Sequence, residues 1–351
     1  MQSIPTFVLG GSGYVAGELL RLLAVHPLFE LAGVLSESRA GEPVAATFPS
    51  LAAAYHERRF VDRESLFAAL PAGPAALFSA APHGASAALL AEVLERAAQA
   101  GCELRVVDVS ADFRFRDPSA YAAVYGSPHA APELLAQFSC ALPEHLAEAR
   151  TPHVAHPGCF ATALLLAAVP LLRLALCAED LHASGVTGST GSGRAPTATT
   201  HHPERHANLC AYKPLAHRHA PEVQQLCEQL TGRRPRLHFV PHSGPFARGI
   251  HLTLQAPLRE PVAADRLRER LADFYAGSEF VKVRDGTPRL KDVIGSNYAH
   301  LGVASDGEAL AVFVVIDNLV KGAAGGAIQW MNRLFGLPEA SGLTAPALAW
   351  A

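Results

Sequence analysis

A cysteine stands at the edge of a long apolar run rather than inside it. Cys159 follows the turn-forming pair Pro157-Gly158 and comes just before the apolar run Ala161–Leu172. A thiol at the start of a helix meets the positive end of the helix dipole, which lowers its pKa, and the thiolate is the nucleophile that acyl transfer requires. We therefore predict that Cys159 is a catalytic nucleophile. The alternative is a small buried apolar side chain, which is our interpretation of Cys102, Cys140, Cys177, Cys210 and Cys227.

A nucleophilic cysteine needs a base, and the segment A-H-R-H-A-P-E supplies two imidazoles. In an extended chain His217 and His219 lie on one face with Arg218 on the other, and Glu222 could orient one of the rings. A metal site would need a further ligand, for which His201-His202 is a candidate, and exposed histidines without a role are the third interpretation. We favour a base in the H-R-H segment.

A glycine-rich turn lies between an apolar strand and an amphipathic helix near the start of the chain. Gly11, Gly13 and Ala16 match the spacing G-x-G-x-x-G/A. Glycines permit a tight turn and a close approach to a pyrophosphate, and the helix N-terminus then faces the phosphates. The turn predicts a dinucleotide site; an ordinary tight turn between strand and helix is the alternative.

The end of the second strand distinguishes the two nicotinamide cofactors. An NAD site usually has an acid there, for the ribose 2′-hydroxyl. Here the residues are Ser36, Ser38 and Arg39, and hydroxyls with a guanidinium suit a 2′-phosphate. Glu37 is the one contrary charge. We predict NADP(H).

Two further segments could contact an anionic ligand. Arg114 and Arg116 follow the fourth strand and could bind an anionic substrate, although ordinary surface charge is an equal alternative. The segment Gly188–Gly193 (G-S-T-G-S-G) suits close backbone approach to a cofactor or phosphate, with a plain flexible loop as the alternative.

The predicted elements place these residues in two different domains. Strands that alternate with helices predict the α/β class, with an N-terminal Rossmann-type domain built on a parallel sheet, and longer alternating strands predict a second, α+β domain with a mostly antiparallel sheet. The first set is Thr6–Leu9, Glu30–Leu35, Ala75–Ser79 and Leu104–Val109 as strands, with helices Gly17–Ala24 and Ser86–Gln99. The second set is Leu237–Pro241, Gly249–Gln255 and Ala309–Ile316 as strands, with helices Ala264–Tyr275 and Gly322–Leu334.

Composition excludes several classes of function. The 351 residues suit two domains, and a formal net charge of -3 without a basic run argues against a nucleic-acid partner. The longest apolar run is too short to span a bilayer and contains Pro170. The first residues have no basic and apolar signal pattern, and the six cysteines form no C-x-x-C pair, so we expect a cytoplasmic protein with reduced thiols, no membrane contact and no metal.

Taken together, these segments resemble the N-acetyl-gamma-glutamyl-phosphate reductases of arginine biosynthesis over nearly the whole chain. H-P-G-C-F resembles the active-site signature of that family, and V-D-V-S-A-D-F-R and I-D-N-L-V-K-G resemble two of its longer motifs. The segments that carry the resemblance are Gly10–Leu19, Ser38–Val44, Pro82–Ser86, Val107–Arg114, His156–Phe160, His217–Glu222, Pro241–Gly249 and Ile316–Gly322.

The resemblance implies an NADPH-dependent reduction of N-acetylglutamyl phosphate to the semialdehyde through a thioester on Cys159. It implies that one imidazole of the H-R-H segment handles protons, with His219 preferred to His217, that Arg114 meets a substrate anion and that Asn318 lies near the cofactor. It also implies a homodimer or homotetramer, with residues 1–155 and a C-terminal helix at about 321–351 binding the dinucleotide and residues 156–320 forming the catalytic and oligomerisation domain.

These arguments give three sets of candidate site residues. The catalytic candidates are Cys159, His219, His217 and Glu222. The substrate-binding candidates are Arg114, Ser110 and Arg218. The cofactor-binding candidates are Gly10, Ser12, Gly13, Tyr14, Val15, Ser36, Ser38, Arg39, Pro82, Ser189, Gly191 and Asn318.

Departures from the family pattern leave alternatives open. Ala161-Thr162 after the cysteine and the segment T-H-H-P-E-R are similar to a sister family, whose members reduce aminoadipyl or glutamyl phosphate carried on a small acidic protein. Aspartate-semialdehyde dehydrogenases share the expected architecture but fit these motifs less well. A non-catalytic NADP-binding sensor, in which Cys159 would be inert, is the rival from another class.

Overall fold

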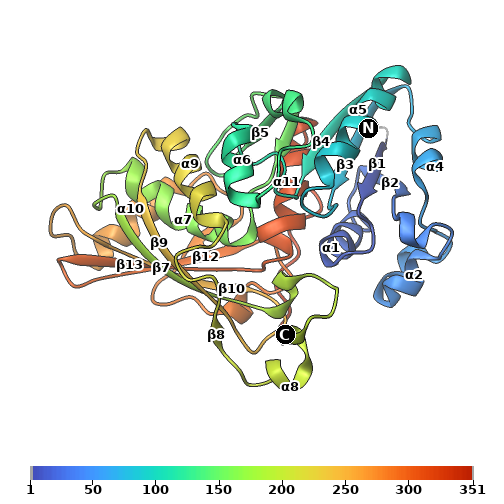
Figure 1. The fold of residues 1–351 in the computed structure, drawn as a ribbon. Coiled ribbons are helices and arrows are strands. Elements are labelled where there is room, and N and C mark those ends of the chain that lie inside the picture. Colours follow the sequence, from blue (N-terminus) through green and yellow to red (C-terminus); the bar gives the residue numbers. More distant parts are fainter. Residues whose placement is uncertain (1–2, 350–351) are drawn as a thin grey trace. The chain divides into compact units, whose positions relative to one another are not determined.

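The first unit of the molecule is built on a fully parallel sheet. The computed structural model describes residues 3–349, which divide into two compact units. Residues 3–141, 148–156 and 324–343 form unit 1, whose six strands lie in the order β2-β1-β3-β4-β6-β5 (Figure 1). Each neighbouring pair is parallel. The strands are β1 (Ile4–Leu9), β2 (Phe29–Val34), β3 (Gly73–Ser79), β4 (Cys102–Asp108), β5 (Phe138–Cys140) and β6 (His153–Ala155).

Amphipathic helices supply the apolar side chains that cover this sheet. In α5 (Ser86–Gln99) the buried apolar residues Ala87, Leu90, Val93 and Ala97 recur every three or four positions, so one stripe of the helix faces the core. α1 (Tyr14–Leu23) follows β1 directly, and α11 (Gly325–Leu334) is buried over most of its length. The predicted α/β class, with an N-terminal Rossmann-type domain, is confirmed.

Short elements of unit 1 were not predicted. β5 and β6 have three residues each, which is too short for an alternating pattern to be recognised. The same holds for the short helices between β2 and β3 and after β4. They are α2 (Val44–Thr47), α3 (Ala52–Tyr55), α4 (Arg63–Ala68) and α6 (Pro118–Tyr125).

Unit 2 contains a mixed, mostly antiparallel sheet, as predicted. Residues 142–147, 157–323 and 344–349 form this unit, and its strands lie in the order β11-β12-β13-β10-β7-β9-β8. Four of the six pairs are antiparallel, while β11 with β12 and β7 with β9 are parallel. The strands are β7 (Asp180–Thr187), β8 (Cys210–Ala211), β9 (Arg236–Ser243), β10 (Ile250–Pro257), β11 (Val281–Val283), β12 (Ala299–Ser305) and β13 (Ala309–Ile316).

One helix of unit 2 is buried on all sides. α7 (Cys159–Arg173) packs on β10 and β13 and also on α9 (His219–Thr231), and each residue from Phe160 to Leu172 is buried. A helix that is apolar all round must be covered all round, which explains this central position. The helix continues for three residues past Pro170, so the proline does not end it. No helix within residues 3–349 is long and apolar enough to cross a membrane.

The last predicted helix is divided in the structure. Residues Val320–Ala324 form a π-helical turn, and α11 begins only at Gly325. The other helices of unit 2 are α8 (His202–Arg205) and α10 (Ala264–Phe274). The chain end returns to unit 2, where the Leu348 amide donates to the Ile294 carbonyl.

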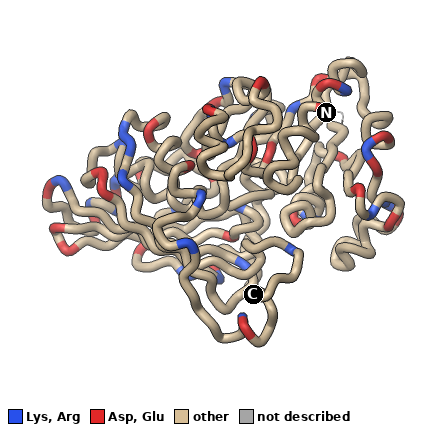
Figure 2. Tube along the Cα trace, in the orientation of Figure 1, with Lys and Arg blue, Asp and Glu red and all other residues tan. Residues whose placement is uncertain are grey.

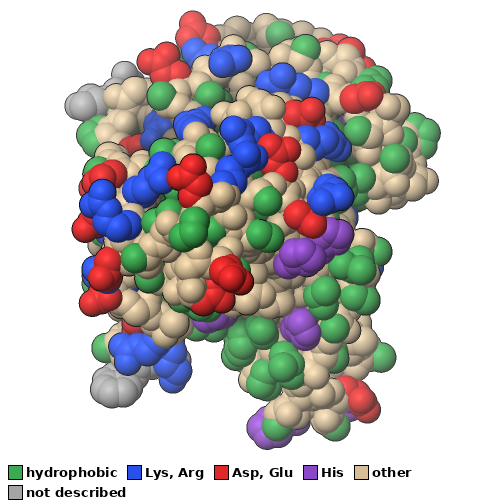
Figure 3. Space-filling view, turned by 90° about the vertical axis from the view of Figure 1, so that its left-hand side faces the viewer, with side chains coloured by type: hydrophobic (Ala, Val, Ile, Leu, Met, Phe, Trp, Pro, Cys, Tyr) green, Lys and Arg blue, Asp and Glu red, His purple; other side chains and the backbone are tan. Residues whose placement is uncertain are grey.

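Charged side chains of both signs are interspersed on the surface. Along the chain trace, Lys and Arg alternate with Asp and Glu in both units (Figure 2). The face drawn in Figure 3 shows a band of basic side chains with acidic side chains between them, and several histidines below the band.

Candidate active site

Cys159 is the first residue of α7, as its position after Pro157-Gly158 predicted. Gly158 forms the N-cap with extended backbone angles, φ -61° and ψ 158°, and offers no side chain to cap the helix. The thiol is neither fully buried nor freely exposed. Peptide dipoles in the first turn of a helix stabilise a thiolate, so this position favours the ionised, nucleophilic form.

The amide that precedes the nucleophile is held by a buried carboxylate. Gly158 N donates to Glu222 Oε1 at 2.8 Å, and the Glu222 side chain is fully buried. Glu222 lies in the first turn of α9, three residues after His219, so the two side chains share one side of that helix. The carboxylate thus fixes the loop that presents Cys159, a role that the sequence did not indicate.

The H-R-H segment is not extended, and this prediction was wrong. Arg218 has helical backbone angles at the N-cap of α9, and His219 is the first residue of the helix. A turn nevertheless brings the two imidazoles together, with ring centroids 4.7 Å apart and planes at 79°. The residue at which a helix begins is uncertain by one or two positions, and a three-residue pattern did not show that α9 starts inside this segment.

The surroundings of His217 limit its capacity to act as a base. The His219 amide donates to His217 Nδ1 at 3.2 Å, which occupies that nitrogen's lone pair. Burial, with smaller effects from the charges of Arg218 and Lys213, lowers the pKa of His217 to about 4. His217 is therefore a neutral ring and a weak base near pH 7, and His219 is buried to a similar degree, with 5% of its surface exposed against 7% for His217.

A tyrosine that the sequence analysis missed lies beside the thiol. Burial and the nearby negative charge of Cys159 both raise the pKa of Tyr212, so its hydroxyl stays protonated. Its ring meets the His217 ring edge-on at 5.6 Å. Tyr212 belongs to no recognisable motif, and only the turn before α9 brings it to this position.

The π-helical turn Val320–Ala324 packs closely against Cys159 through Gly322. A Cβ atom at Gly322 would lie 2.8 Å from Cys159 Cβ and 3.1 Å from its Cα, so only glycine fits. Asp317 Oδ1 accepts from the amides of Leu319 and Val320 at 2.8 and 3.1 Å, and a buried ion pair joins Lys321 to Glu144. These contacts explain why I-D-N-L-V-K-G is a long motif.

Asn318 and the glycine-rich segment of unit 2 come together. Asn318 Oδ1 accepts from Gly249 N at 2.7 Å, and its Nδ2 donates to Thr190 Oγ1 at 3.1 Å. The segment is an ordered turn, because the amides of Ser189 and Thr190 donate to the carbonyls of Phe246 and Ala247. Ser189 and Gly191 flank Thr190 and therefore lie close to Asn318, and the binding of a cofactor by these three residues stays a prediction.

Arg248 is an additional cation of unit 2 that the sequence analysis did not single out. Its Nε and Nη2 lie 3.1 and 3.0 Å from Asp317 Oδ2, and its side chain keeps 26% of its surface exposed while Asp317 has none. The carboxylate orients the guanidinium, and the exposed part leaves room for an anionic ligand.

The glycine-rich turn of unit 1 is crowded at two of its glycines and open at the third. A Cβ at Gly10 (φ +71°) would lie 2.5 Å from the Ala80 carbonyl oxygen, and one at Gly11 would lie 2.3 Å from Val34 Cγ1. Neighbouring protein atoms thus require these two glycines. At Gly13, the N-cap of α1, a Cβ would meet no described atom closer than 3.9 Å. The open space beside this helix N-terminus fits a pyrophosphate.

The remaining cofactor candidates of this turn, Ser12, Tyr14 and Val15, lie at the same helix end. Tyr14 is the first residue of α1 and is partly exposed, and Val15 follows it. Ala16, which stands where the pattern allows glycine or alanine, is fully buried. The alanine therefore serves helix packing and leaves the turn intact.

Glu37, the acidic residue that argues against NADP, forms an ion pair just after the end of β2. Glu37 Oε1 accepts from Arg63 Nε at 3.0 Å, and Arg39 Nη1 donates to Glu42 Oε2 at 2.9 Å. Ser36 is buried at the N-cap of the short turn that contains Ser38, which is exposed. Ser36, Ser38 and Arg39 thus lie together at the end of β2, and the negative charge of Glu37 is paired with Arg63 rather than with Arg39.

Ser110 and Arg114 are buried and hydrogen-bonded within unit 1. Ser110 is 1% exposed and Arg114 4% exposed. Ser110 Oγ donates to Asp108 Oδ2 at 2.6 Å, while Arg114 Nε and Nη2 donate to the carbonyls of His156 and Val109 at 3.0 and 2.9 Å. Both side chains hold groups of unit 1 in place, and their contact with a substrate stays a prediction.

The rest of V-D-V-S-A-D-F-R clamps the loop that contains Pro82. Asp112 Oδ1 accepts from Gly84 N at 2.8 Å and Asp112 Oδ2 from Ala87 N at 3.0 Å, which caps the first turn of α5. Burial raises the pKa of Asp108 to about 6 against the opposing effect of its serine hydrogen bonds. This motif therefore fixes the conformation of the loop that contains Pro82, which we expect to contact the cofactor.

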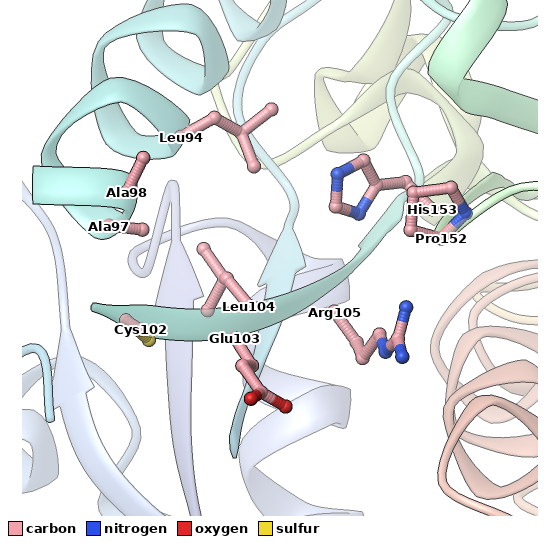
Figure 4. Close-up of a pocket in the computed structure, with 9 residues that line it drawn as sticks. All are labelled: Leu94, Ala97, Ala98, Cys102, Glu103, Leu104, Arg105, Pro152 and His153. Carbon is pink, nitrogen blue, oxygen red and sulfur yellow. The ribbon is translucent and has the colours of Figure 1, made fainter. Parts of the chain in front are cut away.

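A cavity of about 380 Å³ in unit 1 contains none of the candidate residues. It is lined by apolar residues of α5 and β4 together with Glu103, Arg105 and His153 (Figure 4). The alternative metal site of the sequence analysis also lacks support, since within residues 3–349 neither His201 nor His202 belongs to a group with metal-binding spacing.

Two family models match the chain. Residues 6–138 match the family model "Semialdehyde dehydrogenase, NAD binding domain" and residues 159–318 match "Semialdehyde dehydrogenase, dimerisation domain". Among solved structures, aspartate semialdehyde dehydrogenase II from Vibrio cholerae is similar with a TM-score of 0.71 over 96% of this chain and 99% of that one, at 18% identity, which shows the fold.

Curated relatives cover the whole chain. N-acetyl-gamma-glutamyl-phosphate reductase from Dehalococcoides mccartyi is 38% identical over 99% of both chains. The enzyme of the same name from Symbiobacterium thermophilum is 41% identical over 97% of this chain and 98% of its own. A reductase of LysW-linked L-2-aminoadipate phosphate and L-glutamate phosphate from Aeropyrum pernix is 37% identical over 99% of both. The predicted family is thereby confirmed: the chain belongs to the N-acetyl-gamma-glutamyl-phosphate reductases, within the semialdehyde dehydrogenases.

Proposed function

We propose that this chain catalyses the NADPH-dependent reduction of N-acetyl-L-glutamyl 5-phosphate to N-acetyl-L-glutamate 5-semialdehyde and phosphate, a step of arginine biosynthesis. The observation that carries the proposal is the placing of Cys159 in the first turn of α7, with its preceding amide bound by Glu222 and with Gly322 packed against it. Several full-length relatives bear the name of this activity.

The Cys159 thiolate attacks the acyl carbon of the substrate, the bond from that carbon to the phosphate oxygen breaks, and phosphate leaves. The product is a thioester, which accepts hydride more readily than a carboxylate does, so a difficult reduction becomes two easier steps. When bound, the nicotinamide cofactor supplies the hydride. The carbon–sulfur bond then breaks, which returns the thiolate and releases the semialdehyde.

His219 is the proposed proton-handling residue of this cycle. It belongs to the first turn of α9, and Glu222 on the same helix binds the amide before the nucleophile. His217 is a less suitable base because its Nδ1 accepts an amide and its pKa is lowered to about 4. Arg218 and Arg248 are the cations of unit 2 that we propose for the anionic groups of the substrate.

The proposed cofactor is NADP(H), bound by unit 1. The open space at Gly13 suits the pyrophosphate, and Ser36, Ser38 and Arg39 suit the 2′-phosphate. Pro82, Ser189, Gly191 and Asn318 are proposed as further contacts of the cofactor. A homodimer is also proposed, because the family model over residues 159–318 is described as a dimerisation domain.

The second candidate substrate is aminoadipyl or glutamyl phosphate bound to a carrier protein. The Aeropyrum pernix relative, named for such substrates, matches as much of the chain at nearly the same identity. The comparisons give no support to a non-catalytic sensor, since the named relatives are enzymes.

The reverse reaction tests the proposal. Purified protein is mixed with N-acetylglutamate semialdehyde, NADP and phosphate, and NADPH is followed by absorbance, with Cys159→Ser and the matched surface control Cys210→Ser in parallel. We expect phosphate-dependent NADPH formation by the wild type and by Cys210→Ser only. Activity with a carrier-bound semialdehyde instead would favour the second candidate, and no activity with either in a protein that binds NADP would overturn both.

A further inference from the structure

Three potential metal ligands project from the start of two neighbouring strands of unit 2. β7 and β9 run parallel, and His182 is the register partner of His238, while Asp180 precedes His182 by two residues. Because side chains alternate across a strand, Asp180 and His182 lie on the same face of β7. The intervening Leu181 and the following Ala183 are buried on the opposite face.

The ligand atoms of these three residues already converge. One nitrogen or oxygen of each lies within 4.8 Å of those of the other two. His238 Nε2 is 3.0 Å from Asp180 Oδ1, and the two imidazole rings are stacked with centroids 4.7 Å apart and planes at 16°. This is the one such group of histidine, cysteine and acidic side chains within residues 3–349.

We propose that Asp180, His182 and His238 form a surface site for a borderline-soft divalent transition-metal ion, with Zn²⁺ as the representative. Two imidazoles and one carboxylate are a donor set that suits Zn²⁺, Ni²⁺ or Cu²⁺ and does not suit Mg²⁺ or Ca²⁺, which prefer oxygen ligands. Three protein ligands leave the fourth position of a tetrahedral ion for water. The inference does not depend on the proposed function.

Binding requires only a local side-chain adjustment. Two nitrogens bound to one tetrahedral Zn²⁺ lie about 3.3 Å apart, which follows from zinc–nitrogen distances of about 2.0 to 2.1 Å. The side chains must therefore close by up to about 1.5 Å from the 4.8 Å limit. Exposed side chains can do so, and His238 and Asp180 are 45% and 34% exposed.

Arg236 competes with the metal ion for the carboxylate of Asp180. Its Nη2 lies 3.2 Å from Asp180 Oδ2, on the oxygen that His238 does not contact. The arginine side chain is 77% exposed, so it can leave the carboxylate when a metal ion arrives. Removing its charge should therefore tighten metal binding, an effect opposite in sign to that of removing a ligand.

The consequence of occupancy is a link between two parallel strands. An ion bound by residues of both β7 and β9 fixes their register at the start of the strands. Because the ion binds the folded chain through ligands that the unfolded chain does not hold together, it raises the melting temperature by mass action.

The test is a titration of full-length, chelator-treated protein with Zn²⁺, followed by calorimetry and by thermal unfolding. The variant Cys159→Ser, Cys210→Ser serves as the background, because thiolates bind Zn²⁺ as well. In that background we expect one site, a weakening of more than about tenfold in His182→Ala and in His238→Ala, and tighter binding in Arg236→Gln. His251→Ala, on neighbouring β10, is the matched control and should bind as the background does.

Three results would overturn the proposal. They are the absence of saturable Zn²⁺ binding in the background variant, binding that His182→Ala and His238→Ala leave unchanged, and equal losses in these variants and in His251→Ala. Circular dichroism of each variant without metal shows whether it folds. Arg236→Gln keeps the test decisive if a histidine variant fails to fold, since a weaker or unchanged affinity there also contradicts the site.

Discussion

Two polar clusters of this molecule look equally functional in sequence and do different work. Around Cys159 in unit 2, Glu222 and the π-helical turn at Gly322 hold backbone so that a thiol is presented at a helix start. Around V-D-V-S-A-D-F-R in unit 1, the polar side chains are buried and hold a loop and the start of α5. The comparison teaches that residue type alone does not separate a reacting group from a positioning one.

The difference is decided by which atoms remain available. Arg114 and Ser110 use their donors on carbonyls and on Asp108, and almost none of their surface is exposed. Cys159 keeps part of its surface, and its neighbours constrain its position without covering it. Burial and hydrogen-bond partners are properties of the fold, so the sequence could nominate both clusters but could not rank them.

The histidine pair offers the largest expected effect among the neighbours of the thiol. We expect His219→Asn to lower kcat by about a hundredfold or more, which is the usual contribution of a general base or acid. His217→Asn should lower it far less, because the pKa of His217 is lowered to about 4 and its Nδ1 already accepts an amide. Steady-state kinetics of both variants decide this, and a greater loss in His217→Asn would reverse the assignment.

A substitution at Gly322 tests whether the packing of the π-helical turn against Cys159 is needed for activity. A methyl group there would displace Cys159, because its carbon would lie 2.8 Å from Cys159 Cβ. We expect Gly322→Ala to lower kcat by about a hundredfold, the effect of a misplacement near 1 Å, while NADP binding persists. Gly277→Ala is the control, since a Cβ at Gly277 has open space. Equal kinetics of the two variants would show that this packing is not needed.

Glu222 should act through geometry more than through charge. Glutamine can still accept the Gly158 amide, so we expect Glu222→Gln to retain activity within about tenfold. Alanine leaves that amide without its acceptor, with a loss of stability of about 1 to 3 kcal/mol and a larger loss of kcat. Chemical unfolding and kinetics of the two variants separate the effects, and a glutamine variant as inactive as the alanine one would point to a direct catalytic role of the charge.

The cluster in unit 1 should respond in stability rather than in the chemical step. Asp112→Ala leaves the amides of Gly84 and Ala87 without their acceptor, and we expect a loss of about 1 to 3 kcal/mol in the free energy of unfolding. Asp117→Ala, at the exposed N-cap of α6, should lose about 1 kcal/mol. Denaturant unfolding compares the two. A stable Asp112→Ala protein with a lower kcat would instead move this residue into the catalytic machinery.

Sequence patterns predicted the long elements, and they nominated two candidate sites whose roles stay predictions. β13 and α5 have the predicted bounds, because the spacing of apolar residues typical of a strand or of a helix continues over the whole of each element. Cys159 and the turn at Gly13 were nominated from the spacing of neighbouring residues and from the predicted strand or helix beside them. By contrast, α9 was missed because its first turn is rich in histidine, proline and charge, and Tyr212 was missed because it depends on a turn that no local rule predicts.

The most direct measurement is the capture of the acyl-enzyme. Wild-type protein is mixed without nucleotide with the acyl phosphate whose semialdehyde it oxidises, and phosphate release and peptide masses are recorded after rapid acidification. The account predicts one equivalent of phosphate per active site and an acyl group on the peptide that contains Cys159, removable by hydroxylamine and absent in Cys159→Ser. Phosphate released repeatedly without a bound acyl group, or an acyl group on another residue, would contradict it.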